Sequence, residues 1–538
     1  MTGPLAGHAQ VSDVWRLTSR LAGIRGMAID MELASQNKRV ALPAPLAAGA
    51  VFVSSGAVLV LEVTGLRLVG PYLGVTLQTS SAVIGIALAA IAYGAWTGGW
   101  LADRTDPRRL IGPTFLLAAA ATAVTLPLVR WAGEYLRGTA GWSVLLLTTL
   151  AVFTPAALLA AITPLVVKLQ LGDVGQTGRV VGRLSSIGTL GGITATLVTG
   201  FILVAALPTS TILLGLAVAL ALAGAGTVAY LWRLDRAVAV LPTQTNRTGA
   251  VIAVIALVGA GLTTLVPNPC DVETAYHCAK VEVDPARAGG RLLLLNSARH
   301  SFVDLADHRY LEFAYAQWMG AFIDVYRPAG QALRALHIGG GGFTLPRYLD
   351  ATRPGSFSRV LELDGGLVAL DQAELGVVPG PNLDIVVGDA RISLAKQSSA
   401  DVDLIIGDAF GHLAVPWHLT TREFVTEIRR VLTPDGAYAL NVIDYPPASL
   451  IRAEVATVMT VFRHVALVAP PYAVAGQSGA NFVILASNSP LALEALRPRI
   501  AALSGATVLD GYDLAQFVDH ARILTDDYAP VDQLLTRA

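Results

Sequence analysis

Seven long apolar segments precede residue 270, and they constrain this chain more than any other feature. Because the hydrocarbon core of a bilayer is about 30 Å thick, a helix of about 20 apolar residues can span it. The segments are too numerous and too long for a signal peptide. We therefore predict a multi-pass α-helical membrane bundle of about 7 spans, at residues 44-64, 79-100, 110-130, 142-167, 184-206, 209-232 and 249-267.

The composition supports this class of protein. Hydrophobic residues make up 54% of the 538 residues and charged residues only 14%, which excludes a purely soluble enzyme. The net charge of -1 gives no electrostatic argument for binding nucleic acid. In the fifth segment, the run Gly188–Thr196 is rich in Gly and Thr, and such small residues allow helices to pack closely in lipid.

Lys and Arg residues in the short loops predict the orientation of the bundle. On one side lie fourteen of them, namely Arg16, Arg20, Arg25, Lys38, Arg39, Arg104, Arg108, Arg109, Lys168, Arg179, Arg183, Arg233, Arg236 and Arg247. The other side has Arg67, Arg130 and Arg137. We therefore expect a cell-membrane protein with a cytoplasmic N-terminus, and seven spans then put the C-terminal domain on the extracytoplasmic side.

Two cysteines, Cys270 and Cys278, follow the last apolar segment directly. On the orientation above they lie in an oxidising compartment, where a disulfide forms readily. Two unpaired thiols in a cytoplasmic protein are the alternative, because the spacing permits a bond without requiring one. Cysteine ligands are too few for a Cys-based zinc site.

The C-terminal half alternates strands with helices, which is typical of a parallel sheet. Expected strands lie near 333-338, 358-363, 383-387, 402-407, 436-443, 463-468 and 480-486, and the last two are antiparallel because no helix separates them. Two short strands, 279-284 and 291-295, come first, followed by a polar stretch to His308 and a helix from about Tyr310. This pattern predicts an α/β Rossmann-like, methyltransferase-type domain with a small N-terminal β element.

These patterns divide the chain into four parts. We expect an N-terminal cytoplasmic segment at 1-41, a transmembrane helical domain at 42-268, a β-strand element and linking helix at 269-330, and a Rossmann-like domain at 331-538.

Glycines and acids follow the strands of the expected sheet, at the edge where such folds bind ligands. The first strand runs into Gly339–Thr344, and glycines there let the backbone approach a ligand closely. Glu362 and Asp364 end the second strand, where a carboxylate can bind ribose hydroxyls. Asp389 and Asp408 follow the next two strands. Helix N-capping is the alternative for each acid, but four acids on one edge favour a ligand site.

Residues 275 to about 486 resemble the spermidine synthase family of polyamine aminopropyltransferases, and the whole chain resembles its actinobacterial membrane-fused form. The stretches that carry the resemblance are Leu292–Ser297, Ile338–Thr344, Glu362–Asp364, Gly388–Ala390, Asp403–Asp408 and Leu419–Phe424.

The resemblance implies a site for decarboxylated S-adenosylmethionine as co-substrate, with no metal. Glu362 would bind the ribose, Asp389 would hold the adenine amino group, and Asp408 would orient the attacking amine or accept its proton. The donor site would comprise Gly339, Gly340, Gly341, Glu362, Asp364, Asp389 and Ala390, and the catalytic groups would be Asp408, His412, Tyr315 and His300.

The sequence also departs from the family pattern. Phe343 stands where the glycine turn normally continues with an acid, Ala-Phe-Gly411 follows Asp408 without a second acid, and Asp307-His308 replaces an Asp-Glu pair. Three acids that the resemblance leads us to expect near a dicationic substrate such as putrescine are thus missing. His300, His308 and His412 are either replacement catalytic groups, because His titrates near neutral pH, or ordinary loop residues.

Three functions remain open from the sequence. The first is transfer of an aminopropyl group to an amine such as putrescine. The second is a cofactor-independent extracytoplasmic reaction on an amine or a peptide N-terminus, for example glutaminyl cyclisation. The third is a non-catalytic binding or transport-linked domain. The expected partners are the lipid bilayer and a small-molecule or peptide amine, without nucleic acid, and a homodimer is left open.

Overall fold

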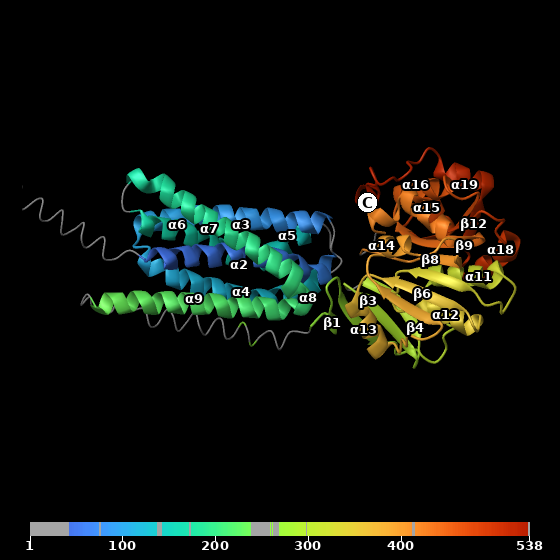
Figure 1. Cartoon of the computed structure of the whole chain (residues 1–538), viewed down its shortest axis with the longest axis horizontal. Coiled ribbons are helices and arrows are strands. Elements are labelled where there is room, and N and C mark those ends of the chain that lie inside the picture. Colours follow the sequence, from blue (N-terminus) through green and yellow to red (C-terminus); the bar gives the residue numbers. More distant parts are fainter. Residues whose placement is uncertain are drawn as a thin grey trace, which may run out of the picture. The chain divides into compact units, whose positions relative to one another are not determined.

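The computed structural model describes residues 42–74, 77–136, 142–171, 174–237, 259, 261, 268–296, 298–411 and 415–535. The chain divides into two compact units, one helical and made of residues before 267, the other mainly α/β and made chiefly of residues 267–538. Figure 1 shows the helices of the first unit in blue to green and the α/β unit in yellow-green to red.

Six helical segments in the described part of the first unit are long and apolar enough to span a membrane. They are α2 (Ala44–Leu73), α3 (Leu77–Arg104), α4 (Arg108–Leu136), α5 (Trp142–Thr148) with α6 (Thr154–Gln170), α7 (Thr177–Val198) with α8 (Val204–Ala206), and α9 (Thr209–Ala237). Short π-helical turns at Thr149–Phe153 and Thr199–Leu203 join the paired segments. The first six expected spans are thus confirmed, and the seventh, 249-267, lies outside the described residues except for Gly259 and Gly261.

Small residues bring these helices into close contact, as the sequence predicted. A Cβ atom added to Gly191 of α7 would lie less than 3.0 Å from the backbone carbonyl of Phe52 in α2. In the same way, a Cβ atom on Gly98 of α3 would collide with the backbone of Ala161 in α6. Because no side chain fits there, glycine sets the distance between these helix pairs.

A small antiparallel sheet opens the α/β unit. Its strands follow the order β1 (Val272–Glu273), β2 (Cys278–Val283), β3 (Gly290–Leu295) and β4 (Ala298–Asp304). Cys270 and Cys278 form a disulfide, so the first of the two alternatives for the cysteines is confirmed. The bond closes the loop that carries β1.

Two expectations for this region were wrong. The polar stretch expected before His308 contains strand β4, whose residues Ser301–Asp304 are buried in spite of their polar members. The helix expected from Tyr310 is α11 (Ala314–Tyr326), because the backbone at Phe313 is still extended.

The second sheet has eight strands in the order β12-β10-β11-β9-β8-β5-β6-β7. Five neighbouring strands pair with one another in parallel, namely β5 (Arg334–Ile338), β6 (Phe357–Glu362), β7 (Leu383–Val387), β8 (Val402–Gly407) and β9 (Leu432–Asp444). Strands β10 (His464–Ala469), β11 (Ala480–Ser487) and β12 (Thr507–Asp510) pair antiparallel. The predicted parallel sheet with an antiparallel end is confirmed, and β12 was not foreseen.

Helices cover both faces of this sheet (Figure 1). Ile405 of β8 packs on one side, against α15 (Arg422–Val431) and α16 (Ser449–Met459), while its neighbours Leu404 and Ile406 pack on the other, against α11. The remaining helices are α12 (Thr344–Thr352), α13 (Gly365–Glu374), α14 (Ala390–Ala395), α17 (Pro471–Val474), α18 (Leu493–Ser504), α19 (Gly511–Val518) and α20 (Val531–Leu534). A sheet buried on both faces leaves its strand ends as the accessible polar edge.

The contact at Gly191 gives a stability prediction. Replacing Gly191 with Ala should lower the thermal unfolding midpoint of the detergent-solubilised chain, since forcing an extra methyl group into a packed interface costs about 1–3 kcal/mol. Gly215→Ala in α9 is the matched control, because a Cβ atom there meets nothing within 4 Å. Equal midpoints for the two variants would contradict the close packing of α2 and α7.

Candidate active site

The glycine turn after β5 lies against the end of β8. Gly339 has a φ of +91° and Gly341 a φ of +49°, both in the left-handed region that favours glycine. A Cβ atom on Gly339 would collide with the backbone carbonyl of Asp408, and one on Gly341 would lie 2.7 Å from Oγ of Ser301. The turn therefore touches β8 and β4, and it brings the two sheets together at this edge.

Phe343, near which the resemblance led us to expect an acid, is completely buried. Its φ is +57°, and its ring packs in an apolar cluster with Val360, Val368 and Val377. The side chain thus belongs to the hydrophobic core and supplies no polar group to the site.

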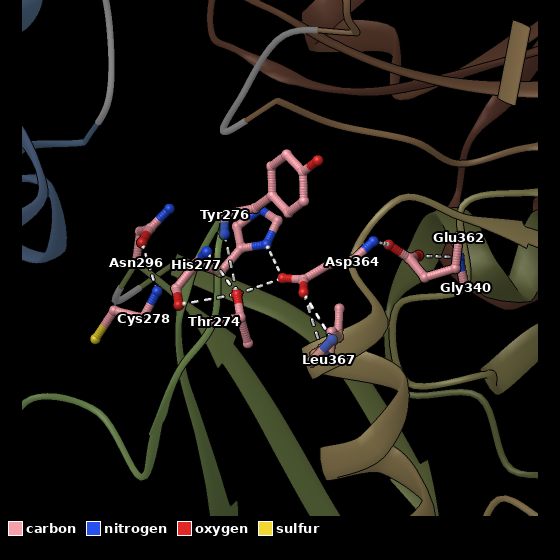
Figure 2. A network of polar contacts seen from close by, with 10 residues as sticks. Thr274, Tyr276, His277, Cys278, Asn296, Gly340, Glu362, Asp364 and Leu367 are labelled. Carbon is pink, nitrogen blue, oxygen red and sulfur yellow. Dashed lines mark hydrogen bonds and ion pairs between the residues drawn. The ribbon is translucent and has the colours of Figure 1, made fainter. Parts of the chain in front are cut away.

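Glu362 connects the end of β6 to the glycine turn (Figure 2). Its Oε2 accepts a hydrogen bond from the backbone amide of Gly340 at 2.7 Å, and its Oε1 accepts one from the amide of Asp364 at 2.9 Å. The residue is 7% exposed. Each oxygen retains one further lone pair, so the carboxylate can still accept a bond from a ligand.

Asp364 forms structural contacts within the fold and is not exposed at the edge of the sheet. Its Oδ1 accepts the amides of Gly366 and Leu367 as the N-cap of α13, and its Oδ2 accepts from Thr274 and lies 3.1 Å from Nδ1 of His277. Burial acts to raise the pKa of this carboxyl, but the hydrogen bonds from His277 and Thr274 outweigh it and hold the pKa below its usual value.

Asp389 ends β7 and also caps a helix. Its Oδ1 accepts the amides of Arg391 and Ile392 at the start of α14, where Ala390 is the first residue. Its Oδ2 lies 3.4 Å from Nε2 of His418, and about a third of the side chain is exposed. The second oxygen remains accessible to a ligand.

Asp408, Tyr315 and His300 line one pocket of about 380 Å³. The other lining residues are Ala298, Arg299, Glu312, Phe313, Ala314, Phe410, Asn441, Ile443 and Asn481. Three of the four predicted catalytic residues therefore meet, and the fourth, His412, lies outside the described residues. His308 is exposed and is not among the lining residues.

Hydrogen bonds fix the carboxyl group of Asp408 in this pocket. Nδ2 of Asn441 donates to its Oδ1 at 2.9 Å, and Tyr315 forms a side-chain hydrogen bond with the same carboxyl. Nδ2 of Asn481 in turn donates to Oδ1 of Asn441 at 3.0 Å, which orients the Asn441 amide.

Burial shifts the pKa values of ionisable groups that line the pocket. It raises the pKa of Asp408 to about 6, although the bonds from Asn441 and Tyr315 act in the opposite direction. It lowers the pKa of His300 to about 4, and the nearby His277 adds to this effect. Burial and the Asp408 carboxyl together raise the pKa of Tyr315 well above its usual value. Near neutral pH the pocket thus holds a weakly basic carboxylate between an uncharged imidazole and an uncharged phenol.

The sequence reasoning missed Asn441 and Asn481 as site residues. Both lie on paired antiparallel strands, β9 and β11, and Asn441 is 1% exposed. An amide inside an otherwise apolar strand was the available signal, because a buried amide requires hydrogen-bond partners.

Comparison with known proteins follows this geometry. Within the described residues we find no group of three or more His, Cys, Asp or Glu side chains that could hold a metal ion. The fold is that of a methyltransferase-type α/β domain, and acids lie at the carboxyl ends of its strands. No protein-family model matches the chain.

Curated relatives with a similar sequence are polyamine aminopropyltransferases. The chain is 28% identical over 214 residues to the polyamine aminopropyltransferase of Vibrio vulnificus, covering 37% of this chain and 69% of the relative. It is 27% identical over 166 residues to that of Chromobacterium violaceum, covering 30% and 62%. The chain is thus similar in sequence to polyamine aminopropyltransferases, and its α/β unit resembles a spermidine synthase-like transferase domain.

Among solved structures, the chain is similar to a probable spermidine synthase from Corynebacterium glutamicum. Sequence identity is 29%, the TM-score is 0.44, and the match covers 48% of this chain and 95% of that one.

The contacts of Asp364 give a testable stability difference. Asp364→Asn should destabilise the chain at pH 7 by about 1–2 kcal/mol, since it weakens an N-cap and a charge-assisted bond. Because the pKa of Asp364 is lowered in the folded state, its contribution is complete above the unfolded value of about 3.9 and is lost as the pH falls through the folded value.

Thermal unfolding at several pH values measures this effect. The exposed Asp350, changed to Asn, is the control. A difference between wild type and Asp364→Asn that does not narrow toward low pH would contradict the assigned charge state.

Proposed function

We propose that the α/β unit transfers an aminopropyl group from decarboxylated S-adenosylmethionine to an amine acceptor. The observation that carries this proposal is the Asp408 carboxyl, held by Asn441 and Tyr315 in a pocket at the carboxyl ends of the strands. Similarity to the polyamine aminopropyltransferases supports it independently.

The residues at the neighbouring strand ends fit the donor. A carboxylate such as Glu362, with lone pairs left over beside the glycine turn, suits ribose hydroxyls, and the accessible oxygen of Asp389 suits an exocyclic amino group. A Cβ atom on Gly340 would lie 3.2 Å from Oε2 of Glu362, so glycine keeps this approach open.

The reaction needs a neutral amine and a proton acceptor. The amine nitrogen attacks the carbon next to the sulfonium, the new C–N bond forms as the C–S bond breaks, and methylthioadenosine leaves with the electron pair. The ammonium product then gives its extra proton to Asp408. A carboxylate with a pKa of about 6 is ionised near neutral pH and is a better base than an exposed one.

The pocket proposed for the acceptor is lined by side chains of both charges. Glu312 and Asp408 line the pocket together with Arg299, whose guanidinium lies 5.2 Å from the centre of the Phe313 ring. Phe343 contributes no acid, since its ring is buried in the core. With two carboxylates and one guanidinium among its lining residues, the pocket suits an acceptor that carries positive charge.

The pKa of Asp408 sets the expected pH dependence. Turnover by the full chain should fall below about pH 6, as Asp408 becomes protonated, and Asp408→Asn should lower kcat by about 10²–10⁴-fold. Asn441→Leu removes a bond that lowers the pKa of Asp408, so the acidic limb of the profile should move to higher pH.

The exposed Asn382, changed to Leu, is the matched control and should leave the profile in place. Full turnover in Asp408→Asn would overturn the role of Asp408 as the base.

Two observations favour a second candidate, a cofactor-independent extracytoplasmic reaction on an amine or peptide N-terminus. The Cys270–Cys278 disulfide suits an oxidising compartment, and the distribution of Lys and Arg supports an extracytoplasmic C-terminal domain. The sulfonium donor is a product of cytoplasmic metabolism. Glutaminyl cyclisation would use the same neutral amine and base without a donor.

Nucleoside binding separates these candidates. Calorimetry of the full chain in detergent with decarboxylated S-adenosylmethionine and methylthioadenosine should show binding if the first is right. Absence of binding to both, with turnover of a glutaminyl peptide, would select the second. If the chain neither binds these nucleosides nor turns over the peptide, a non-catalytic role in binding another ligand or in transport is favoured.

A reporter that is active only in the cytoplasm, fused after Ala538, tests the side of the membrane. We expect no signal, and a positive signal would contradict the seven-span topology.

A further inference from the structure

The loop closed by the Cys270–Cys278 disulfide contacts the donor side of the candidate site. It contains β1, and two of its residues, Thr274 and His277, reach the N-terminal end of α13 (Figure 2). Neither Thr274 nor His277 has a role in the mechanism proposed above.

Thr274 organises this loop from within. Its Oγ1 accepts hydrogen bonds from the amides of Tyr276 at 3.2 Å and His277 at 2.8 Å, and it donates to Oδ2 of Asp364. Thr274 is 5% exposed. The loop is thus folded around the hydroxyl that contacts Asp364.

Glycine permits this close approach. A Cβ atom on Gly366, in the first turn of α13, would lie 2.9 Å from the Thr274 methyl group. Behind the loop, Ala279, Leu293 and Leu295 of the small sheet pack on Leu367 and Leu370 of α13. Two kinds of contact, polar and apolar, therefore hold the loop and its sheet on this helix.

A continuous chain of hydrogen bonds leads from the loop to the glycine turn. Thr274 and His277 contact Asp364, the amide of Asp364 donates to Glu362, and Glu362 accepts the amide of Gly340. The side chain of Asp364 is held at both oxygens, because Oδ2 takes part in these contacts and Oδ1 caps α13. The position of the Asp364 amide then fixes the orientation of the Glu362 carboxylate.

We propose that Thr274 and His277 are positioning residues of the donor site, and that the Cys270–Cys278 disulfide holds them in place. They act through Asp364 on Glu362, which orients the ribose of the donor. This inference rests on the proposed function for its kinetic consequence, but its structural part is independent of which ligand binds. Reduction of the disulfide should loosen the loop and with it the donor site.

Hydrogen exchange of the full chain in detergent tests the structural part. In His277→Ala and Thr274→Val, the amides of Gly340 and Asp364 should exchange about tenfold faster, as expected for the loss of a hydrogen bond to a charged group. The amide of Gly342, which donates to Ser301 at 3.0 Å, is an internal reference and should not change.

Further variants separate positioning from general destabilisation. His277→Asn keeps a polar nitrogen near Asp364 and should restore slow exchange. Cys270→Ser combined with Cys278→Ser should behave like the reduced wild type and no longer respond to a reductant. Val283→Ala, at an exposed position near the end of β2, is the control for changes in this sheet.

Steady-state kinetics tests the functional part. In His277→Ala the KM for the donor should rise about tenfold, while kcat and the KM for the acceptor stay within about twofold. Unchanged exchange at Gly340 and Asp364 in both His277→Ala and Thr274→Val would overturn the proposal. If wild type binds no nucleoside while exchange responds as expected, the proposed function fails and the positioning role stands.

Discussion

The parallel register of β5, β6 and β8 is the constraint on which the rest of the candidate site depends. Ile338 pairs with Leu361 on one side and with Gly407 on the other, so the residues that follow these strands emerge at one level. The glycine turn, Glu362 and Asp408 are neighbours for this reason alone. The backbone hydrogen bonds between these strands align the ends of the strands, and this alignment does not depend on side-chain contacts.

Different environments then give these aligned acids different chemistry. Asp364 is tied to a helix end and to the disulfide loop, and its pKa is lowered. Asp408 is buried in a pocket with two neutral partners, and its pKa is raised to about 6. Acids that look alike in the sequence thus differ in pKa, because hydrogen bonds dominate at Asp364 and burial dominates at Asp408.

The sequence predicted what depends on local pattern and strand order. The length of the apolar segments predicted the six described spans. The alternation of strands and helices predicted the sheet and the acids at its edge. It did not predict β4, since Arg299 and His300 make that strand look polar, nor the start of α11, where aromatic residues continue the apolar pattern through Phe313. Asn441 was missed as a site residue because its role depends on the pairing of β9 with β11, which brings Asn481 near it.

Phe343 has a consequence for how such a site changes during evolution. Its ring fills an apolar cluster, although the resemblance noted in the sequence leads us to expect an acid here. Substrate preference and core stability are therefore encoded in one residue. A return to an acid at this position would leave a cavity and bury a charge at the same time, so the neighbouring Val360, Val368 and Val377 would have to change with it. Packing around the Phe343 ring therefore limits which residues this position can accept.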